Sequence, residues 1–515
     1  MRKPNRMKLL MLSTTLAIMS AFVGPLAHSS DAHRVQETSI QQTENNRQSR
    51  KSLAGNWLGV LDVGGTRLRL VLKISVDAND SLRASLDSID QAATGLRVDR
   101  IVRTGPSIRA ELNGIGAVFE GQLNADETEM AGTWAQGAGV LPLVFKRVNE
   151  TPAAPRRPQE PHKPYPYTEE EVVYENKQDK VKLAGTLTIP RSRGPHPAVL
   201  LITGSGPEDR DETVFGHRPF LVLADYLTRR GIAVLRVDDR GVGGSSATVA
   251  GAIETSENYA ADALSGVEFL KTRREINARQ IGLLGHSEGG MIAPLAAVRS
   301  KDVAFIVLMA GPGVTGDQLL ELQAELILKA NGADDRLVAY NRRLQRLMTT
   351  ILRTEKSDAA AERRLRTELP QLIASMPEEK TKALGITPEA MEGQIRMMLT
   401  PWYRFILFHD PRPVLKQVRC PVLAIAGERD LQVPAKQNLP AIAGALKEGG
   451  NRDYTTIELP GLNHLLQTSR TGSPNEYAQI EETISPKALE LIANWIIKQT
   501  TPQPSSAQGG VAGQK

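Results

Sequence analysis

A serine between two glycines is the residue of this chain best suited to chemistry. The segment Gly285-His286-Ser287-Glu288-Gly289 has the pattern Gly-x-Ser-x-Gly and separates a predicted strand from a predicted helix. At such a turn the serine backbone is strained and its hydroxyl stands clear of the sheet, where it can attack a substrate. An ordinary glycine-rich turn is the alternative, and the features that follow argue against it.

A serine hydroxyl is a poor nucleophile and needs a neighbouring base. Around a turn of this kind the order along the chain is serine, then acid, then histidine. Of the eight histidines, only His409 and His464 follow Ser287. His409 lies in a charged helical stretch, whereas His464 comes five residues after the predicted strand 455–459. We therefore predict His464 as the base.

The acid should lie between Ser287 and His464, at the end of a buried strand. The segment 424–434 contains two carboxylates, Glu428 and Asp430, directly after an apolar run. We predict Asp430 as the acid, with Glu428 as the runner-up. The acid would hold His464 in the correct tautomer and stabilise the imidazolium.

An attacking serine also requires two N–H groups that bind the developing oxyanion. We expect one from Glu288, directly after the nucleophile. The other should come from the loop Thr203-Gly204-Ser205-Gly206-Pro207, where we favour the Ser205 N–H. A plain glycine-rich turn is the alternative interpretation of that loop.

The elements that must position these residues follow an α/β pattern from about residue 170. Apolar, non-alternating strands such as 197–203 and 281–285 alternate with helices such as 220–230 and 289–299. This pattern predicts a mostly parallel sheet covered on both faces. The alternation stops between about 315 and 415, where a charged helical insertion should form a lid over the carboxyl edge of the sheet.

The N-terminal part has a different pattern. Residues 51–148 alternate apolar and polar side chains between turn-rich breaks, which predicts a small all-β domain, either a barrel or a sandwich. A proline-rich linker follows at 149–168 and favours an extended spacer. The α/β domain would then span 169–500.

The N-terminal end of the chain suggests export, and both ends contain polar segments. Residues 1–30 have the basic start, apolar run and small residues of a signal peptide, while 31–50 and 501–515 are polar and predicted to be disordered. An uncleaved membrane anchor is the alternative, but the apolar run is short and contains hydroxyl residues. We expect a periplasmic or extracellular protein with no stable membrane insertion after cleavage.

The charge gives no reason to expect nucleic-acid binding. The net charge of +5 falls to about +1 without the four basic residues of the leader. The lone cysteine, Cys420, precedes a buried strand and is interpreted as a small core residue. We see no clustered ligand set, so no metal or cofactor is expected.

Residues 170–500 resemble the α/β-hydrolase superfamily. The segments Gly-His-Ser-Glu-Gly-Gly (285–290), Asp238–Ser245 and Gly427–Asp430 are similar to those of bacterial secreted esterases and serine-aminopeptidase-like hydrolases. The resemblance implies that Asp238 and Arg240 are structural supports. The chain departs from it at the oxyanion loop, where many relatives have His-Gly and this chain has Thr203-Gly204. The β region, notably residues 132–137, looks similar to domains that precede such hydrolases.

These observations predict a serine esterase that acts on a small-molecule carboxylic ester through an acyl-enzyme. A peptidase or aminopeptidase acting on short peptides is an alternative of the same chemistry. A catalytically inactive protein that binds a cell-envelope ligand is an alternative from another class, and the complete set of serine, acid and histidine argues against it. The sequence leaves the oligomeric state open.

Overall fold

The computed structural model describes residues 53–63, 66–91, 93–136, 139–153, 155–248, 254–386 and 388–501. The predicted signal peptide, the predicted disordered segment 31–50 and all of the predicted tail except Thr501 lie outside these residues. In the described ranges, every helix is too short or too polar to span a bilayer.

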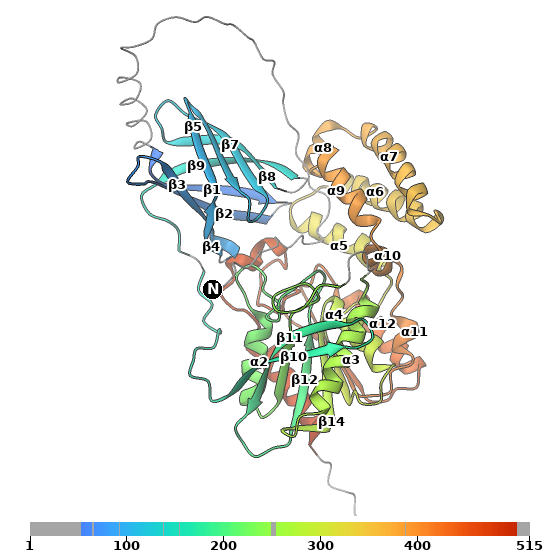
Figure 1. Cartoon of the computed structure of the whole chain (residues 1–515). Helices are drawn as coiled ribbons and strands as arrows, with labels where there is room; N and C mark the ends of the chain where they lie inside the picture. The colour runs from blue at the N-terminus through green and yellow to red at the C-terminus, as the bar shows by residue number, and fades with distance from the viewer. Residues whose placement is uncertain are drawn as a thin grey trace, which may run out of the picture.

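The N-terminal domain is a single antiparallel sheet. Its strands in the described residues are β1 (Gly55–Val63), β2 (Thr66–Val76), β3 (Leu82–Ser88), β4 (Ala93–Val98), β5 (Arg100–Thr104), β6 (Ser107–Leu112), β7 (Ala117–Leu123), β8 (Glu129–Gln136) and β9 (Gly139–Val148). They pair in the order β4-β3-β2-β1-β9-β8-β7-β6-β5. The two ends of this sheet contact each other, so it curls into a nearly closed barrel (Figure 1). Of the two predicted alternatives, barrel and sandwich, the barrel is therefore the one formed.

Alternating side chains fill the barrel, as expected for strands with one face buried. Trp57, Phe119 and Phe145 are fully buried, and the two phenylalanine rings meet edge to face with centroids 5.0 Å apart. These large side chains are part of the buried apolar cluster at the centre of the barrel.

The linker, residues 149–168, is bound to the C-terminal domain by hydrogen bonds. Its Arg157 guanidinium donates to the carbonyls of Phe215, Ala478 and Ile480. Phe215 also packs against the barrel core. The barrel thus lies against the segment that contains the short helix η2 (Pro474–Gln479), which follows His464 along the chain.

The C-terminal domain is built on a second sheet. Its described strands are β10 (Tyr167–Asn176), β11 (Val181–Pro190), β12 (His196–Ile202), β13 (Ala233–Val237), β14 (Ile276–His286), β15 (Phe305–Met309), β16 (Val422–Gly427) and β17 (Tyr454–Leu459). The order is β10-β11-β13-β12-β14-β15-β16-β17. β10 and β11 run antiparallel to their neighbours, and all pairs from β13 to β17 are parallel. The parallel strands therefore end at one common edge.

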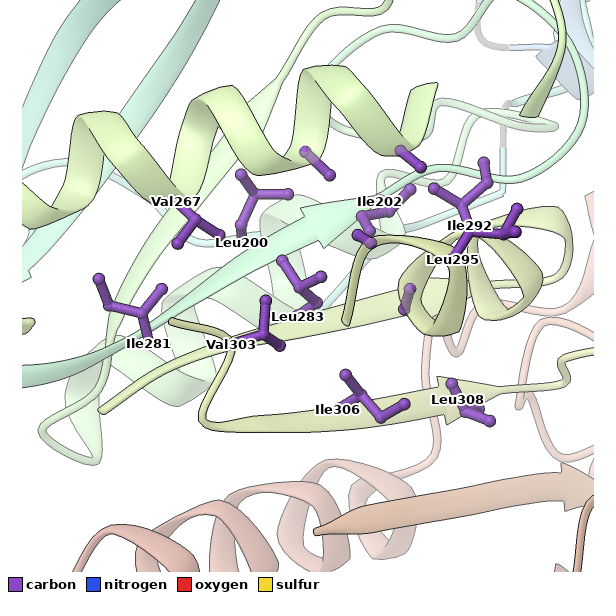
Figure 2. Close-up of a cluster of buried hydrophobic side chains, with 14 of the residues drawn as sticks. Leu200, Ile202, Val267, Ile281, Leu283, Ile292, Leu295, Val303, Ile306 and Leu308 are labelled. Atoms are coloured by element: carbon purple, nitrogen blue, oxygen red, sulfur yellow. The ribbon is translucent and has the colours of Figure 1, made fainter. Parts of the chain in front are cut away.

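Helices cover both faces of this sheet. One face carries α3 (Ser256–Lys271), α4 (Glu288–Ala297) and α12 (Ala435–Glu448), and the other carries α2 (Pro219–Arg229) and α13 (Pro486–Thr500). Figure 2 shows the first layer, in which Leu200, Leu283 and Ile306 of adjacent strands meet Val267 and Ile292 of α3 and α4. Burial on both faces explains why these strands are apolar without alternation.

The predicted insertion is helical. It contains α5 (Gly316–Ala330), α6 (Asp335–Thr354), α7 (Asp358–Ala374), α8 (Glu378–Ala383), α9 (Pro388–Met398), α10 (Pro401–Phe408) and the short α11 (Arg412–Leu415). These helices have a hydrophobic cluster of their own, with Leu344, Ile351 and Leu365 almost fully buried. The insertion and the barrel lie on the same side of the α/β domain, and α9 contacts β9 (Figure 1).

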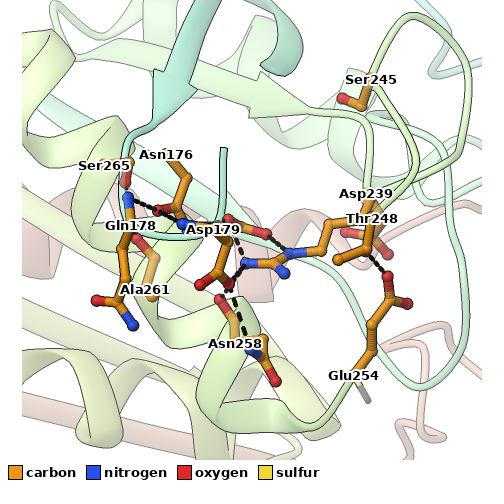
Figure 3. Close-up of polar contacts among 12 residues, drawn as sticks. Asn176, Gln178, Asp179, Asp239, Ser245, Thr248, Glu254, Asn258, Ala261 and Ser265 are labelled. Carbon is orange, nitrogen blue, oxygen red and sulfur yellow. Dashed lines mark hydrogen bonds and ion pairs between the residues drawn. The ribbon is translucent and has the colours of Figure 1, made fainter. Parts of the chain in front are cut away.

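Asp238 and Arg240 bind parts of the scaffold. Asp238 accepts hydrogen bonds from the backbone N–H groups of Arg210 and Gly244. Arg240 donates to Asp179 at 2.5 Å and to Asp262 at 2.8 Å. Figure 3 shows part of this network, in which Asn258 also donates to Asp179. The loop after β13 is thereby tied to the start of α3.

Candidate active site

Ser287 lies at the sharp turn between β14 and α4. Its φ is 53° and its ψ is −116°, a strained conformation that non-glycine residues seldom adopt. A Cβ on Gly285 would lie 1.9 Å from the Gly289 carbonyl oxygen, and one on Gly289 would lie 2.2 Å from the Ile202 carbonyl oxygen. Both glycines are therefore required for the turn to pack against its own helix and against β12.

Asp430 and His464 form a buried pair at the carboxyl edge of the sheet. The Nδ1 of His464 lies 2.9 Å from Asp430 Oδ2, and the two side chains are 7% and 0% exposed. Asp430 Oδ1 also accepts the backbone N–H groups of Gln432 and Val433. A carboxylate held in this way accepts from Nδ1–H and leaves Nε2 as the nitrogen that can accept a proton.

Glu428, the runner-up for the acid, has another role. Its Oε2 accepts the backbone N–H of Gly461 at 2.8 Å. Glu428 therefore fixes the start of the loop that contains His464, and Asp430 makes the contact with the imidazole.

The structure brings the serine turn and the histidine loop together through His286. The Nε2 of His286 lies 3.0 Å from the His464 carbonyl oxygen, and the two imidazole centroids are 4.8 Å apart. Among the described residues, no hydrogen bond joins Ser287 Oγ to His464 Nε2. Such bonds are often long in free enzymes and shorten when substrate binds.

His409 lies apart from this group, at the end of α10 in the insertion. Its ring stacks on Phe405 with centroids 4.7 Å apart. It has no contact with Asp430 or Ser287 among the described residues, which agrees with its exclusion as the base.

The two predicted oxyanion donors are both available. Neither the Ser205 N–H nor the Glu288 N–H donates to any acceptor in the described part of the chain. By contrast, the Gly204 N–H is occupied by Glu212 Oε1 at 2.9 Å. The position where Gly204 would carry a Cβ lies 3.6 Å from the Ser287 Cβ, so this loop passes directly beside the nucleophile.

Glu288 joins the insertion to the nucleophile turn. Its buried carboxylate accepts from Ser256 Oγ at 2.6 Å and from the indole Nε1 of Trp402 in α10 at 3.1 Å. Burial raises the pKa of Glu288, and the hydroxyls of Ser256 and Ser205 and the Trp402 indole oppose that rise. Trp402 therefore anchors the insertion beside the predicted oxyanion hole.

Sequence reasoning did not identify three further acidic or basic groups near the nucleophile. Glu212, His286 and Glu208 are all buried. Burial first, and then the charges of Glu212 and neighbouring carboxylates, raise the pKa of Glu208 well above its usual value. The acid-rich segment 209–212 after the oxyanion loop was a signal for Glu212, but no sequence pattern pointed to Trp402.

A cavity of about 40 Å³ lies behind the oxyanion loop. Gly204, Gly206, Tyr259 and Glu288 line it, and Ser287 does not. Its volume is far below that of a typical ligand pocket. In the described residues, no group of three or more His, Cys, Asp or Glu side chains could hold a metal ion.

The strand order of the C-terminal sheet identifies the fold of this domain. Numbered along the chain, its strands stand in the order 1-2-4-3-5-6-7-8, with the nucleophile turn after the fifth and the acid after the seventh. The C-terminal domain has the α/β-hydrolase fold. Residues 218–469, which include all three predicted triad residues, match the serine aminopeptidase family, S33.

The chain is also similar to a curated protein. It is 29% identical over 322 residues to esterase EstD of Thermotoga maritima, a match that covers 61% of this chain and 66% of the relative. The chain thus spans slightly less than two thirds of that relative's length. Together with the family match, this similarity supports a hydrolase of the esterase and aminopeptidase kind.

Two solved structures match this chain at low sequence identity and low TM-score. An esterase of Pyrococcus furiosus is 15% identical, with a TM-score of 0.38, over 65% of this chain and 91% of that one. A proline iminopeptidase of Mycobacterium smegmatis is 17% identical, with a TM-score of 0.39, over 64% and 98%.

Proposed function

We propose that this α/β-hydrolase is a serine esterase that cleaves small carboxylic esters with Ser287, His464 and Asp430. The observation that carries the proposal is the buried Asp430–His464 hydrogen bond, at the same sheet edge as the strained Ser287 turn. The similarity to EstD supports the ester as the substrate class.

In the proposed reaction, His464 Nε2 accepts the proton of Ser287 Oγ as that oxygen attacks the ester carbonyl carbon. The N–H groups of Ser205 and Glu288 stabilise the oxyanion. His464 then gives the proton to the departing alcohol oxygen, and an acyl-enzyme remains. Water, deprotonated by His464, then attacks the acyl carbon, the bond to Ser287 Oγ breaks, and His464 returns the proton to that oxygen as the carboxylic acid leaves.

A peptidase acting on short peptides is the second candidate. The match to the serine aminopeptidase family favours it, because the same triad can cleave an amide. An aminopeptidase must also bind the positively charged amine of its substrate, and the buried Oε2 of Glu208, which has no hydrogen-bond partner among the described residues, is an acceptor for such an amine.

We also propose that the protein is exported and acts in the periplasm or outside the cell on a small molecule, without nucleic acid. The basic and apolar leader supports export. Detection of the chain in the periplasmic or culture fraction, shortened near residue 30, would test this point.

The decisive experiment combines labelling with a substrate panel. A fluorophosphonate probe should label the parent enzyme and fail to label Ser287→Ala, whereas the surface variant Ser300→Ala should be labelled normally. Turnover of a short p-nitrophenyl ester should exceed that of aminoacyl p-nitroanilides. A reversed preference would favour the peptidase, and undiminished turnover in Ser287→Ala would refute the proposed mechanism.

A further inference from the structure

Glu212 holds the oxyanion loop from a buried position. It is the last residue of the segment 209–212 after that loop, has a φ of 52° and is 3% exposed. Its Oε1 accepts the backbone N–H of Gly204 at 2.9 Å and lies 2.8 Å from His286 Nδ1. Gly204 directly precedes Ser205, whose N–H is the predicted oxyanion donor.

The partners of His286 determine where its protons are. Its Nε2 faces the His464 carbonyl oxygen, and since a carbonyl oxygen can only accept, Nε2 carries a hydrogen. Its Nδ1 faces a carboxylate oxygen that already accepts from Gly204, so Nδ1 carries a hydrogen as well. His286 is therefore an imidazolium, bound to the carboxylate of Glu212.

The surroundings of His286 agree with this assignment. Burial lowers its pKa, but the charge and hydrogen bond of Glu212, the His464 carbonyl and the nearby charge of Asp430 outweigh burial and raise it. The titratable groups that face the ring are therefore Glu212, Asp430 and His464 itself.

We propose that Glu212 and His286 are positioning residues that fix the oxyanion loop, the nucleophile turn and the His464 loop relative to one another. One buried ion pair connects three segments that are far apart in sequence: Gly204 before the predicted oxyanion donor, His286 before Ser287, and the backbone of His464. Nothing in the proposed reaction assigns either side chain a proton-transfer step. The inference deepens the proposed esterase function and depends on it for its kinetic test.

The geometry explains why such a pair would affect the rate. The oxyanion donor and the base act on the same carbonyl group, so a displacement of about 1 Å between them can cost about 100-fold in rate. This alignment matters in the transition state, whereas binding of the substrate in its ground state does not require it. KM should therefore change less than kcat.

Four full-length variants test the coupling: Glu212→Ala, Glu212→Gln, His286→Ala and the double variant Glu212→Ala/His286→Ala. With a short p-nitrophenyl ester we expect each alanine variant to lower kcat about 10- to 100-fold, with KM within about threefold. The double variant should be no worse than the poorer single one, because both changes remove one unit. Glu212→Gln should recover part of the rate, since its amide oxygen can still accept from Gly204.

A matched control is Glu170→Ala, which removes a carboxylate from the Arg273 ion pair at the edge strand β10. It should leave kcat unchanged. Circular dichroism and thermal unfolding of each variant identify loss of fold, and Glu212→Gln, with the same shape as the native residue, keeps the test valid if the alanine variants fail to fold.

A measurement that does not depend on turnover examines the charge state directly. In protein labelled with ¹⁵N-histidine, both ring nitrogens of His286 should still carry hydrogen above pH 6.5, the ordinary pKa of histidine, and only one should in Glu212→Gln. Three outcomes would overturn the inference. His286 could be neutral in the parent enzyme, kcat could be unchanged in Glu212→Ala, or the loss of kcat in the double variant could equal the product of the losses in the two single variants. If the parent enzyme shows no turnover yet His286 is charged as expected, the proposed function fails and the ion pair stands.

Discussion

Two carboxylate–imidazole pairs lie next to each other in this protein, and they have almost the same geometry. Asp430 contacts Nδ1 of His464 at 2.9 Å, and Glu212 contacts Nδ1 of His286 at 2.8 Å. All four side chains are at most 7% exposed. The pairs differ at the other ring nitrogen.

The Nε2 of His286 is bound to a carbonyl oxygen, whereas the Nε2 of His464 makes no hydrogen bond with any described residue. A ring with both nitrogens occupied cannot accept a proton, and a ring with a free Nε2 can. The comparison teaches that the carboxylate partner alone does not identify a general base. The second ring nitrogen must also be free, and this condition selects His464 as the proposed base.

The largest expected effect on the rate comes from removing each imidazole in turn. His464→Ala should lower kcat by about 10⁶-fold, because loss of the base disables the whole triad. His286→Ala should lower it by no more than about 100-fold, because only alignment is lost. Steady-state kinetics with one ester measure both. Equal losses would mean that the two histidines have been assigned the wrong roles.

The next test concerns the carboxylates. Asp430→Asn should reduce kcat by about 10⁴-fold, because an amide donor at that place favours the wrong tautomer of His464. Glu428→Gln serves as the control, since its side chain contacts the backbone of Gly461 and leaves the imidazole untouched. A loss in Glu428→Gln as large as that in Asp430→Asn would reopen the choice of acid.

A third buried histidine has no carboxylate contact among the described residues. Its effect on the pH dependence of stability can be compared with that of His286. His217 accepts from the Thr483 hydroxyl at Nδ1 and donates from Nε2 to the Tyr477 carbonyl. Burial, and then the charge of Arg157, lower the pKa of His217 from 6.5 to about 4. Between about pH 6.5 and pH 4, His217 is therefore protonated in the unfolded chain and neutral in the folded chain.

The free energy of unfolding should consequently fall by about 3 kcal/mol from this residue as the pH drops from about 6.5 to about 4. Urea unfolding at several pH values measures it, and His217→Gln should lose this part of the slope while the exposed control His162→Gln keeps it. His286 has the opposite sign, because its raised pKa gives stability below its unfolded value that is lost as the pH rises. An identical slope in His217→Gln and the parent would contradict a neutral His217.

The smallest expected effect is at the contact between the insertion and the nucleophile turn. Trp402→Phe removes the indole hydrogen bond to Glu288 and should lower the free energy of unfolding by about 1 kcal/mol. Tyr403→Phe, on the same helix, is the control, because its hydroxyl donates to no described residue. If Trp402→Phe were as stable as the control, the insertion would be held by its apolar contacts alone.

The sequence by itself determined the features that depend on short stretches of chain. The Ser287 turn needs two glycines because of clashes with neighbouring backbone, and buried parallel strands are apolar because both of their faces are covered. The order of serine, acid and histidine and the extent of the helical insertion could be predicted from these local patterns.

Only the tertiary structure decided what depends on which strands are neighbours. β12 lies between β13 and β14, which brings the loop after β12 beside the turn after β14 and lets Glu212 reach His286, 74 residues away. The curling of one sheet into a barrel and the contact of Trp402 with Glu288 also depend on residues that are far apart in the sequence. Local periodicity sets which face of a strand is buried, but long-range pairing sets which buried polar groups meet.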